Sequence, residues 1–262
     1  MESNTPVGVA AALNNAVIGV PSAVFNESNS AEQQQQIVKE LYDSHPLLTA
    51  GFWKSVIFSL KNNKFVQVPA QLFVESSAGE YLKFNAHIDH DQDIVKSCAN
   101  SRLDSVTVYL VPKALNDFLT SIYQNTTLKF VHQSSALIEG VIHATGQNED
   151  SPLYLYVDRF KLHIMAARNG RLIYYNQFAI KHFGDYVKYI MLVLSALGMN
   201  QQTSKVVMWG YIGKNSMHFH EFAKYIRNVT FGKRPEHLSF GYMFDEVQEH
   251  HFFDLYATEL LA

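Results

Sequence analysis

Cysteine is almost absent from this chain, because Cys98 is the only one among 262 residues. A single cysteine excludes an internal disulfide and any zinc site built from several thiolates. The surrounding residues, VKSCANS, give no sign of an activated thiolate, and no Gly-x-Ser-x-Gly nucleophile motif occurs anywhere. We therefore expect an intracellular, cytoplasmic protein and identify no catalytic residue.

Charge is also scarce. Charged residues make up 17% of the chain, the net charge is −3 and the isoelectric point is near 6.4. No cluster of lysine and arginine stands out, so neither a nucleic acid nor an anionic membrane surface is expected as a partner. A surface this poor in charge favours cover by another protein.

Long apolar runs are missing as well. The most apolar stretch, YIMLVLSALG at residues 189–198, is too short to span a bilayer and predicts a buried helix. The N-terminus carries Glu2 where a signal peptide has basic residues, and Asn14 and Asn15 interrupt its apolar stretch. We expect no signal peptide and no membrane insertion.

Two stretches share the same turn chemistry: NNAVIGVPSAVFNES at residues 14–28 and NNKFVQVPAQLFVES at residues 62–76. Asn-Asn between apolar runs predicts a β-hairpin, since asparagine tolerates positive φ, and the following Val-Pro ends regular pairing. This pattern is common, so shared turn chemistry explains it better than a duplication at this spacing.

A longer-range repeat is more informative. AALNNAVIGV from Ala11 aligns with AARNGRLIYY from Ala166, and in both places a helical pattern and then an apolar strand follow. The strands are SVIFSL at residues 55–60 and KVVMWGYIG at residues 205–213. With LYLYVDRF at residues 153–160 as a first strand, and the last 19 residues as a closing helix, the second half has the order β-β-β-α-β-α-β-α.

That duplicated order resembles the actin-like ATPase fold, an α/β fold of two ribonuclease-H-like halves with mixed sheets and flanking helices. The chain is similar, over nearly its whole length, to an uncharacterised bacterial domain-of-unknown-function (DUF) family with that fold. The motifs that carry this resemblance are NNKFVQVPAQLF, QSSALIEGVIHA and VKYIMLVLSALGMNQQTSKVVMWGYIG.

The resemblance predicts a first half at residues 1–146 and a second at 147–262, joined near ATGQNEDSP (144–152). Residues 74–102 are expected to be an insertion in the first half, either a partner surface or a solvated loop with a short helix. The first half also has one strand fewer than the family. Two explanations fit this difference: translation begins just after the place of the family's first strand, or the residues MESNTP replace that strand.

The resemblance implies two phosphate loops, each an Asp followed by a glycine-rich turn, with the Asp reaching Mg²⁺. Asp158 stands at that place in the second half, but Arg159, Phe160 and Lys161 replace the glycines. We therefore interpret Asp158 as a turn residue or an ion-pair partner of Arg159 in preference to a metal-phosphate ligand. The first half has no Asp-x-Gly.

For the adenosine-binding segment, the resemblance points to Gly210 and Gly213 in MWGYIGKNS. The same stretch narrowly fails to match a P-loop, because Met208 and Asn215 replace the first glycine and the hydroxyl residue. A turn between a strand and a helix often needs glycine in any case. The cofactor-binding candidates are therefore Asp158, Arg159, Gly210 and Gly213, and they matter only if a nucleotide binds.

Three histidine-rich stretches could supply metal ligands: HIDHD (87–91), HFHE (218–221) and EHH (249–251). None has the i, i+4 histidine pair of a helical zinc site, so we expect surface residues and no metal site.

Three functions remain open. The leading hypothesis is a catalytically silent scaffold that binds an unidentified protein and needs no cofactor. Its candidate contact surface is formed by Phe52, Trp53 and residues 74–102, although Trp53 is equally expected in the core. The alternative is an ATP-binding or phosphotransfer protein that uses Asp158, Arg159, Lys161 and Lys214. A ribonuclease-H-like nuclease ranks last, because KVVMWGYIG has no acidic residue. The oligomeric state stays open.

Overall fold

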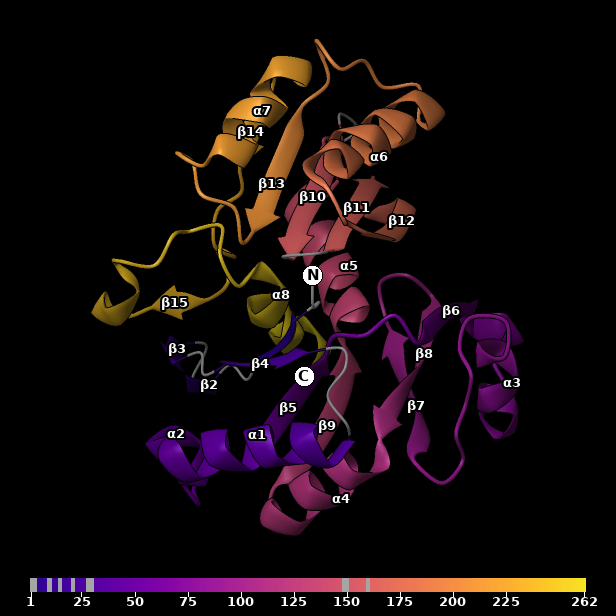
Figure 1. Cartoon of the computed structure of the whole chain (residues 1–262), viewed down its shortest axis with the longest axis vertical. Helices are drawn as coiled ribbons and strands as arrows, with labels where there is room; N and C mark the ends of the chain where they lie inside the picture. Colours follow the sequence, from indigo (N-terminus) through magenta and orange to yellow (C-terminus); the bar gives the residue numbers. More distant parts are fainter. Residues whose placement is uncertain are drawn as a thin grey trace.

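The computed structural model of the chain describes residues 4–8, 11–13, 16–19, 22–26, 31–147, 151–158 and 161–262 (Figure 1). These residues form two main sheets, with α5 (Gln133–Thr145) and α8 (Phe253–Tyr256) between them. The α/β architecture agrees with the expected fold class. The division of the chain at residues 146 and 147 stays a prediction.

The sheet of the second half has five strands in the order β12-β11-β10-β13-β14. Their bounds are β10 Leu153–Asp158, β11 Lys161–Arg168, β12 Arg171–Ala179, β13 Val206–Gly210 and β14 Val229–Phe231. The helices α6 (Phe183–Ala196) and α7 (Met217–Tyr225) pack on one face and α5 on the other. All six residues of β10 are buried, because successive side chains enter the cores on opposite faces.

The sheet of the first half has four strands among the described residues, in the order β4-β1-β5-β9. The bounds here are β1 Asn4–Gly8, β4 Ser22–Asn26, β5 Ser55–Leu60 and β9 Thr127–His132, with helices α1 Ala31–Ser44, α2 Pro46–Thr49 and α4 Lys113–Ile122. β9 is parallel to β5, whereas β1 is antiparallel to β5. Within the described residues, no strand takes the place that β10 has in the second half.

The predicted repeat is visible in the register of two hairpins. β2 (Ala11–Leu13) pairs with β3 (Ala16–Gly19), and β11 pairs with β12. In both hairpins the register shifts by one residue at the same aligned place, between Ala11 and Ala12 and between Ala166 and Ala167. The predicted turn residues Asn14 and Asn15 lie outside the described residues. The two hairpins differ in the strands beside them, because β3 pairs with β15 (Ser239–Phe240) in a separate small sheet.

The hairpin predicted around Asn62 and Asn63 is wrong. The strand that follows this turn, β6 (Phe65–Pro69), joins a different sheet, of order β6-β8-β7, while β5 stays in the main sheet. The Asn62 amide donates to the carbonyl of Leu110 in β8 at 3.0 Å. The turn therefore connects two sheets.

The segment expected as an insertion at 74–102 belongs to a larger folded unit, residues 65–112. This unit contains β6, η1 (Ala70–Leu72), η2 (Glu75–Ser77), α3 (Ala78–Leu82), β7 (Asp93–Asn100) and β8 (Ser105–Pro112). It has its own core around Leu82 and Val108, so the expectation of a solvated loop is wrong. Figure 1 shows the unit beside the first sheet.

The helix α6 is less buried than its apolar sequence suggested. Ile190 and Leu194 are in the core, but Leu192 is 61% exposed, so the helix has one open face. Gly198 follows the helix with φ of +65°, the left-handed conformation with which glycine commonly ends a helix. The apolar sequence of α6 also predicts that it is the most buried helix of the second half, and this expectation is wrong, because every residue of α8 is buried.

The single closing helix expected from residue 244 onward is also wrong. The chain forms η3 (Tyr242–Phe244), then turns, and becomes helical again only at α8 and η4 (Ala257–Leu261). His250 explains the interruption: its carbonyl accepts from the Gly210 amide and its Nε2 contacts the Ile212 carbonyl, which fixes this segment to the end of β13. Asp245 and Glu246 thus precede the last helix and do not open it. No helix of the described residues is long and apolar enough to cross a membrane.

The unequal burial of two leucines in α6 gives a direct test. Replacing Leu194, which is 2% exposed, by alanine should lower the free energy of unfolding by about 2–5 kcal/mol, because the cavity does not refill. The matched control Leu192→Ala, on the open face, should change it by less than about 0.5 kcal/mol. Urea unfolding of both variants measures these values, and equal losses would contradict the packing described here.

Candidate functional site

Four charged or polar side chains from distant parts of the chain meet between the two sheets. Lys61 directly follows β5, Asp158 ends β10, Gln133 begins α5 and Asp254 lies in α8. All four are at most 4% exposed. The Lys61 Nζ lies 2.7 Å from Oδ2 of Asp254 and 3.6 Å from Oδ2 of Asp158. We call these four residues the Lys61 cluster.

Hydrogen bonds complete the cluster. The Gln133 amide donates to Oδ2 of Asp158 and to Oδ2 of Asp254, at 2.9 Å each. The Tyr156 hydroxyl donates to the other oxygen of Asp254. Oδ1 of Asp158 is buried and has no hydrogen-bond partner within the described structure. Asp254 is thus fully engaged, and Asp158 is engaged through one oxygen.

The Lys61 ammonium stays protonated in this setting. Burial by itself lowers the pKa of a lysine, but the carboxylates of Asp158 and Asp254 outweigh it and raise the pKa of Lys61 above its ordinary value. Burial, and then Asp254, raise the pKa of Tyr156 well above the usual range, so its hydroxyl remains a donor. The cluster therefore holds one permanent cation between two acidic side chains.

Two buried histidines border the cluster. Burial, followed by the nearby positive charge of Lys161 and Lys61, lowers the pKa of His163 well below its usual value. Burial lowers the pKa of His132 to about 3. His132 also caps α5 by accepting from the Ser134 amide. The sequence pattern QSSAL favours Ser134 or Ser135 as the N-cap, and this expectation is wrong because the helix already begins at Gln133, before both serines. Both imidazoles are neutral near pH 7 and add no charge.

Gly210 lies beside the cluster, and backbone packing requires glycine at this position. It has φ of +102°, and a Cβ at this position would lie 2.1 Å from the carbonyl oxygen of Val157. The next amide, of Tyr211, donates to that same carbonyl at 2.8 Å. Close packing of β13 on β10 therefore requires glycine here, whether or not a ligand binds.

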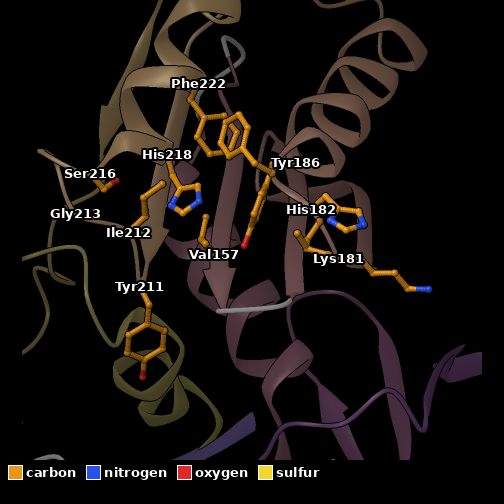
Figure 2. A pocket seen from close by; sticks show the side chains of 12 residues that line it. Val157, Lys181, His182, Tyr186, Tyr211, Ile212, Gly213, Ser216, His218 and Phe222 are labelled. Atoms are coloured by element: carbon orange, nitrogen blue, oxygen red, sulfur yellow. The ribbon is translucent and has the colours of Figure 1, made fainter. Parts of the chain in front are cut away.

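An open pocket of about 520 Å³ lies at the carboxyl ends of β10 and β13, between the starts of α6 and α7. Figure 2 shows the side chains of Tyr186 and His218 turned toward it from different helices, while the Lys181 ammonium points away. Its lining residues are Val157, Ile180, Lys181, His182, Phe183, Tyr186, Tyr211, Ile212, Gly213, Ser216, His218 and Phe222. The walls combine aromatic and aliphatic side chains with imidazole and hydroxyl groups.

The structure brings only some of the predicted residues together. Asp158 and Gly210 end neighbouring strands, and Gly213 lines the pocket. Arg159 lies outside the described residues, so its contact with Asp158 stays a prediction. The Lys214 ammonium lies over the ring of Phe231.

Sequence reasoning missed three members of the cluster: Lys61, Gln133 and Asp254. Two of them carried a signal. Lys61 follows an apolar strand without a break, and Asp254 is a lone acid in the apolar run HFFDLY. A charge inside a buried run needs a partner of opposite sign, which would have suggested searching for this pair.

Removing the central cation tests the cluster. Lys61→Ala should lower the free energy of unfolding by about 3–5 kcal/mol, because it leaves two buried carboxylates without an ammonium. The matched control is Lys64→Ala, whose ammonium is half-exposed and pairs with Asp93 at 3.6 Å; it should cost no more than about 1 kcal/mol.

Millimolar Mg²⁺ should recover part of the loss in Lys61→Ala, since the oxygen atoms of two aspartates suit a hard cation, and should leave the wild type unchanged. Thermal unfolding with and without Mg²⁺ measures this recovery. Equal losses in the two lysine variants, or Mg²⁺ stabilisation of the wild type, would contradict the assigned role of Lys61.

Comparison with solved structures shows the fold. A Bacteroides thetaiotaomicron protein with an actin-like ATPase fold and unknown function matches with a TM-score of 0.71 and 18% identity, over 99% of this chain and 96% of that one. The type IV pilus biogenesis complex PilM–PilN matches with a TM-score of 0.59 and 10% identity, over 98% and 96%. The ethanolamine utilization protein EutJ from Carboxydothermus hydrogenoformans matches with a TM-score of 0.53 and 9% identity, over 98% and 86%. The chain thus has an actin-like ATPase fold, as its sequence resemblance implied.

The family comparison covers most of the sequence. No curated protein matches the chain. The model of the family described as "Protein of unknown function (DUF3822)" matches residues 7–229, from the first strand of the first sheet to the last strand of the second. The chain therefore belongs to the DUF3822 family.

Proposed function

We propose that this chain is a cytoplasmic, catalytically silent actin-like protein that works as a scaffold by binding another protein. The observation that carries the proposal is the position of the Lys61 ammonium, whose Nζ lies 3.6 Å from Oδ2 of Asp158. Asp158 is the aspartate at the place of the phosphate loop in the second half. In an actin-like ATPase that aspartate reaches Mg²⁺. Here a built-in cation from the first half is its partner.

The residues present do not fit a magnesium nucleotide. Oδ2 of Asp158 already accepts from Gln133 and faces Lys61, and a divalent cation placed beside a buried ammonium would be repelled by several kcal/mol. Arg159 and Phe160 replace the glycines that would let a phosphate approach the backbone. These features support degenerate phosphate loops.

Binding of a protein is supported by exposed apolar side chains on the folded unit 65–112. Phe84 is 96% exposed, Leu72 67% and Val74 53%. Large apolar side chains exposed on one folded unit are typical of a protein-binding surface. The similar PilM structure was solved as a complex with PilN, and we extend only the principle of protein binding to this chain. Phe52 is also exposed, but α2, which precedes it, lies across the first half from α3 (Figure 1), so Phe52 and Trp53 do not share a surface with this unit.

The alternative, an ATP-binding protein, has its own supporting observations. Oδ1 of Asp158 has no hydrogen-bond partner in the described structure, and the pocket beside Val157 includes Gly213. An experiment with nucleotide distinguishes the two proposals.

A thermal scan with and without millimolar Mg-ATP should show no shift in the melting temperature. A ligand at a hundred times its dissociation constant would stabilise the fold by about 2.7 kcal/mol, which is about 2–4 °C for a chain of this size. Asp158→Ala serves as the matched variant. A shift of several degrees in the wild type that is lost in Asp158→Ala would overturn the silent-scaffold proposal and support the alternative.

The exposed phenylalanines allow a matched test of the partner surface. Phe84→Ser should reduce the protein captured from a native cell extract about tenfold, because an apolar anchor at an interface contributes more than about 1.4 kcal/mol. Phe52→Ser, at an exposed site on the far edge (64% exposed), should leave capture unchanged. Equal capture by both variants would remove the unit 65–112 from the binding surface.

A further inference from the structure

Exposed apolar side chains gather around the helix α3 of the unit 65–112. The Tyr81 hydroxyl of α3 donates to the Leu72 carbonyl at 2.7 Å and accepts from the Val74 amide at 3.1 Å. These two bonds hold the segment with the exposed side chains of Leu72 and Val74 beside α3, and the exposed Phe84 follows the end of the same helix by two residues. Figure 1 shows α3 on the side of the unit that faces away from the first sheet.

An open pocket of about 420 Å³ lies next to these side chains, between α3 and the loop that follows it. Gly79 and Glu80 line it from α3, and Ile88 and His90 line it from the loop. Gly79 lies close to Ile88, since a Cβ at Gly79 would be 3.7 Å from the Cδ1 of Ile88. Lys83, the residue before Phe84, also lines the pocket, so the pocket and the exposed side chains share one side of α3.

The same segment is strongly acidic. Residues 70–93 contain five acidic residues and one lysine, a net charge of −4, whereas the whole chain has a net charge of −3. Two of these acids have a lysine partner: Glu80 pairs with Lys83 at 2.6 Å, and Asp93 pairs with Lys64 at 3.6 Å. The other three are exposed and have no ion pair within the described residues: Glu75, Asp89 and Asp91.

The remaining basic residues of the unit face the rest of the molecule. The Lys96 ammonium lies 4.4 Å from the centroid of the Phe130 ring in β9. The Nε of Arg102 lies 3.6 Å from an oxygen of Glu139 in α5. Neither side chain is directed toward α3, so the outer side of the unit combines exposed apolar groups with negative charge that no lysine or arginine offsets.

We infer that the surface formed by residues 70–93 binds a basic segment of a partner protein, in which apolar side chains alternate with lysine or arginine. Apolar contacts with Phe84 and its neighbours supply affinity, and the carboxylates select a partner of opposite charge. The inference rests on the proposed protein-binding role and adds the chemistry of the partner.

The charge of the surface disfavours its other possible occupants. Nucleic acid and anionic lipid carry the same sign of charge as Glu75, Asp89 and Asp91. A second copy of the chain does not supply the opposite charge, because the sequence outside residues 70–93 has 20 basic and 19 acidic residues and no cluster of lysine and arginine.

The test uses the full chain and two labelled peptides, KLFKKLFKKLFK and ELFEELFEELFE, in fluorescence anisotropy at pH 7.5. The lysine peptide should bind, and the glutamate peptide should bind at least about tenfold more weakly, because like charges across an interface repel. The affinity of the lysine peptide should fall as salt is raised, since salt screens exposed charges. No binding of the lysine peptide, or equal affinity for both peptides, would overturn the inference.

Matched charge reversals locate the site. Glu75→Lys combined with Asp91→Lys should weaken binding of the lysine peptide about tenfold, and Phe84→Ser should weaken it by a similar factor. The control, Asp43→Lys combined with Glu236→Lys, makes the same change in net charge at exposed positions beside α2 and β15, which lie away from α3 (Figure 1). It should weaken binding by no more than about twofold in 0.1 M salt, where distant charges are largely screened. Equal losses in the two charge variants would overturn the inference.

Two further measurements address the other occupants. Self-association in sedimentation that Phe84→Ser abolishes would assign the surface to a second copy, and phosphatidylcholine vesicle binding that Phe84→Ser abolishes would assign it to a membrane; either result overturns the inference. If the lysine peptide fails while capture from the extract still depends on Phe84, the partner chemistry is wrong and the scaffold proposal stands. If Mg-ATP stabilises the chain through Asp158, the scaffold proposal fails whatever the peptides do.

Discussion

The buried ion pairs of Lys61 join parts of the chain that are nearly two hundred residues apart. An ammonium at 4% exposure is tolerated only beside carboxylates, and Asp158 and Asp254 provide them from β10 and α8. Gln133, at the start of α5, donates to both carboxylates. The end of β5, the end of β10 and both central helices must therefore come together at one point. Such a network adds little net stability over an apolar core, but removing a single member is costly, so it fixes how these elements meet.

The same network determines what the space between the sheets can do. The ammonium of Lys61 already offsets negative charge of Asp158 and Asp254, and the neighbouring histidines are neutral. This charge arrangement disfavours the binding of a metal ion in the Lys61 cluster. Gly210, which resemblance alone would assign to a nucleotide, is explained by the contact of β13 with the Val157 carbonyl. An actin-like fold in which a lysine of the chain itself faces Asp158 is consistent with the proposed scaffold role. The exposed apolar side chains of the unit 65–112 suit that role.

Much of the fold could be predicted from sequence, because turn chemistry and periodicity are local properties. The repeat between Ala11 and Ala166 holds down to the same shift in register. Errors arose where tertiary contacts decide. The turn at Asn62 connects two sheets, which strand pattern alone cannot show, and His250 interrupts the closing helix by bonding to β13. Asp158 was found because a motif pointed to it. Lys61 was missed because its partners lie far away in the chain and only the folded structure brings them together.

The central claim is that Lys61 is a permanent cation held between Asp158 and Asp254, and NMR of its Nζ group tests this most directly. Because burial with two carboxylates raises its pKa, the Lys61 ammonium should keep its proton at a pH where exposed lysines, with pKa values of about 10.4, have lost theirs. Its signal should also stay unchanged when Mg²⁺ is added. A Lys61 ammonium that titrates together with the exposed lysines, or that shifts on addition of Mg²⁺, would contradict the account.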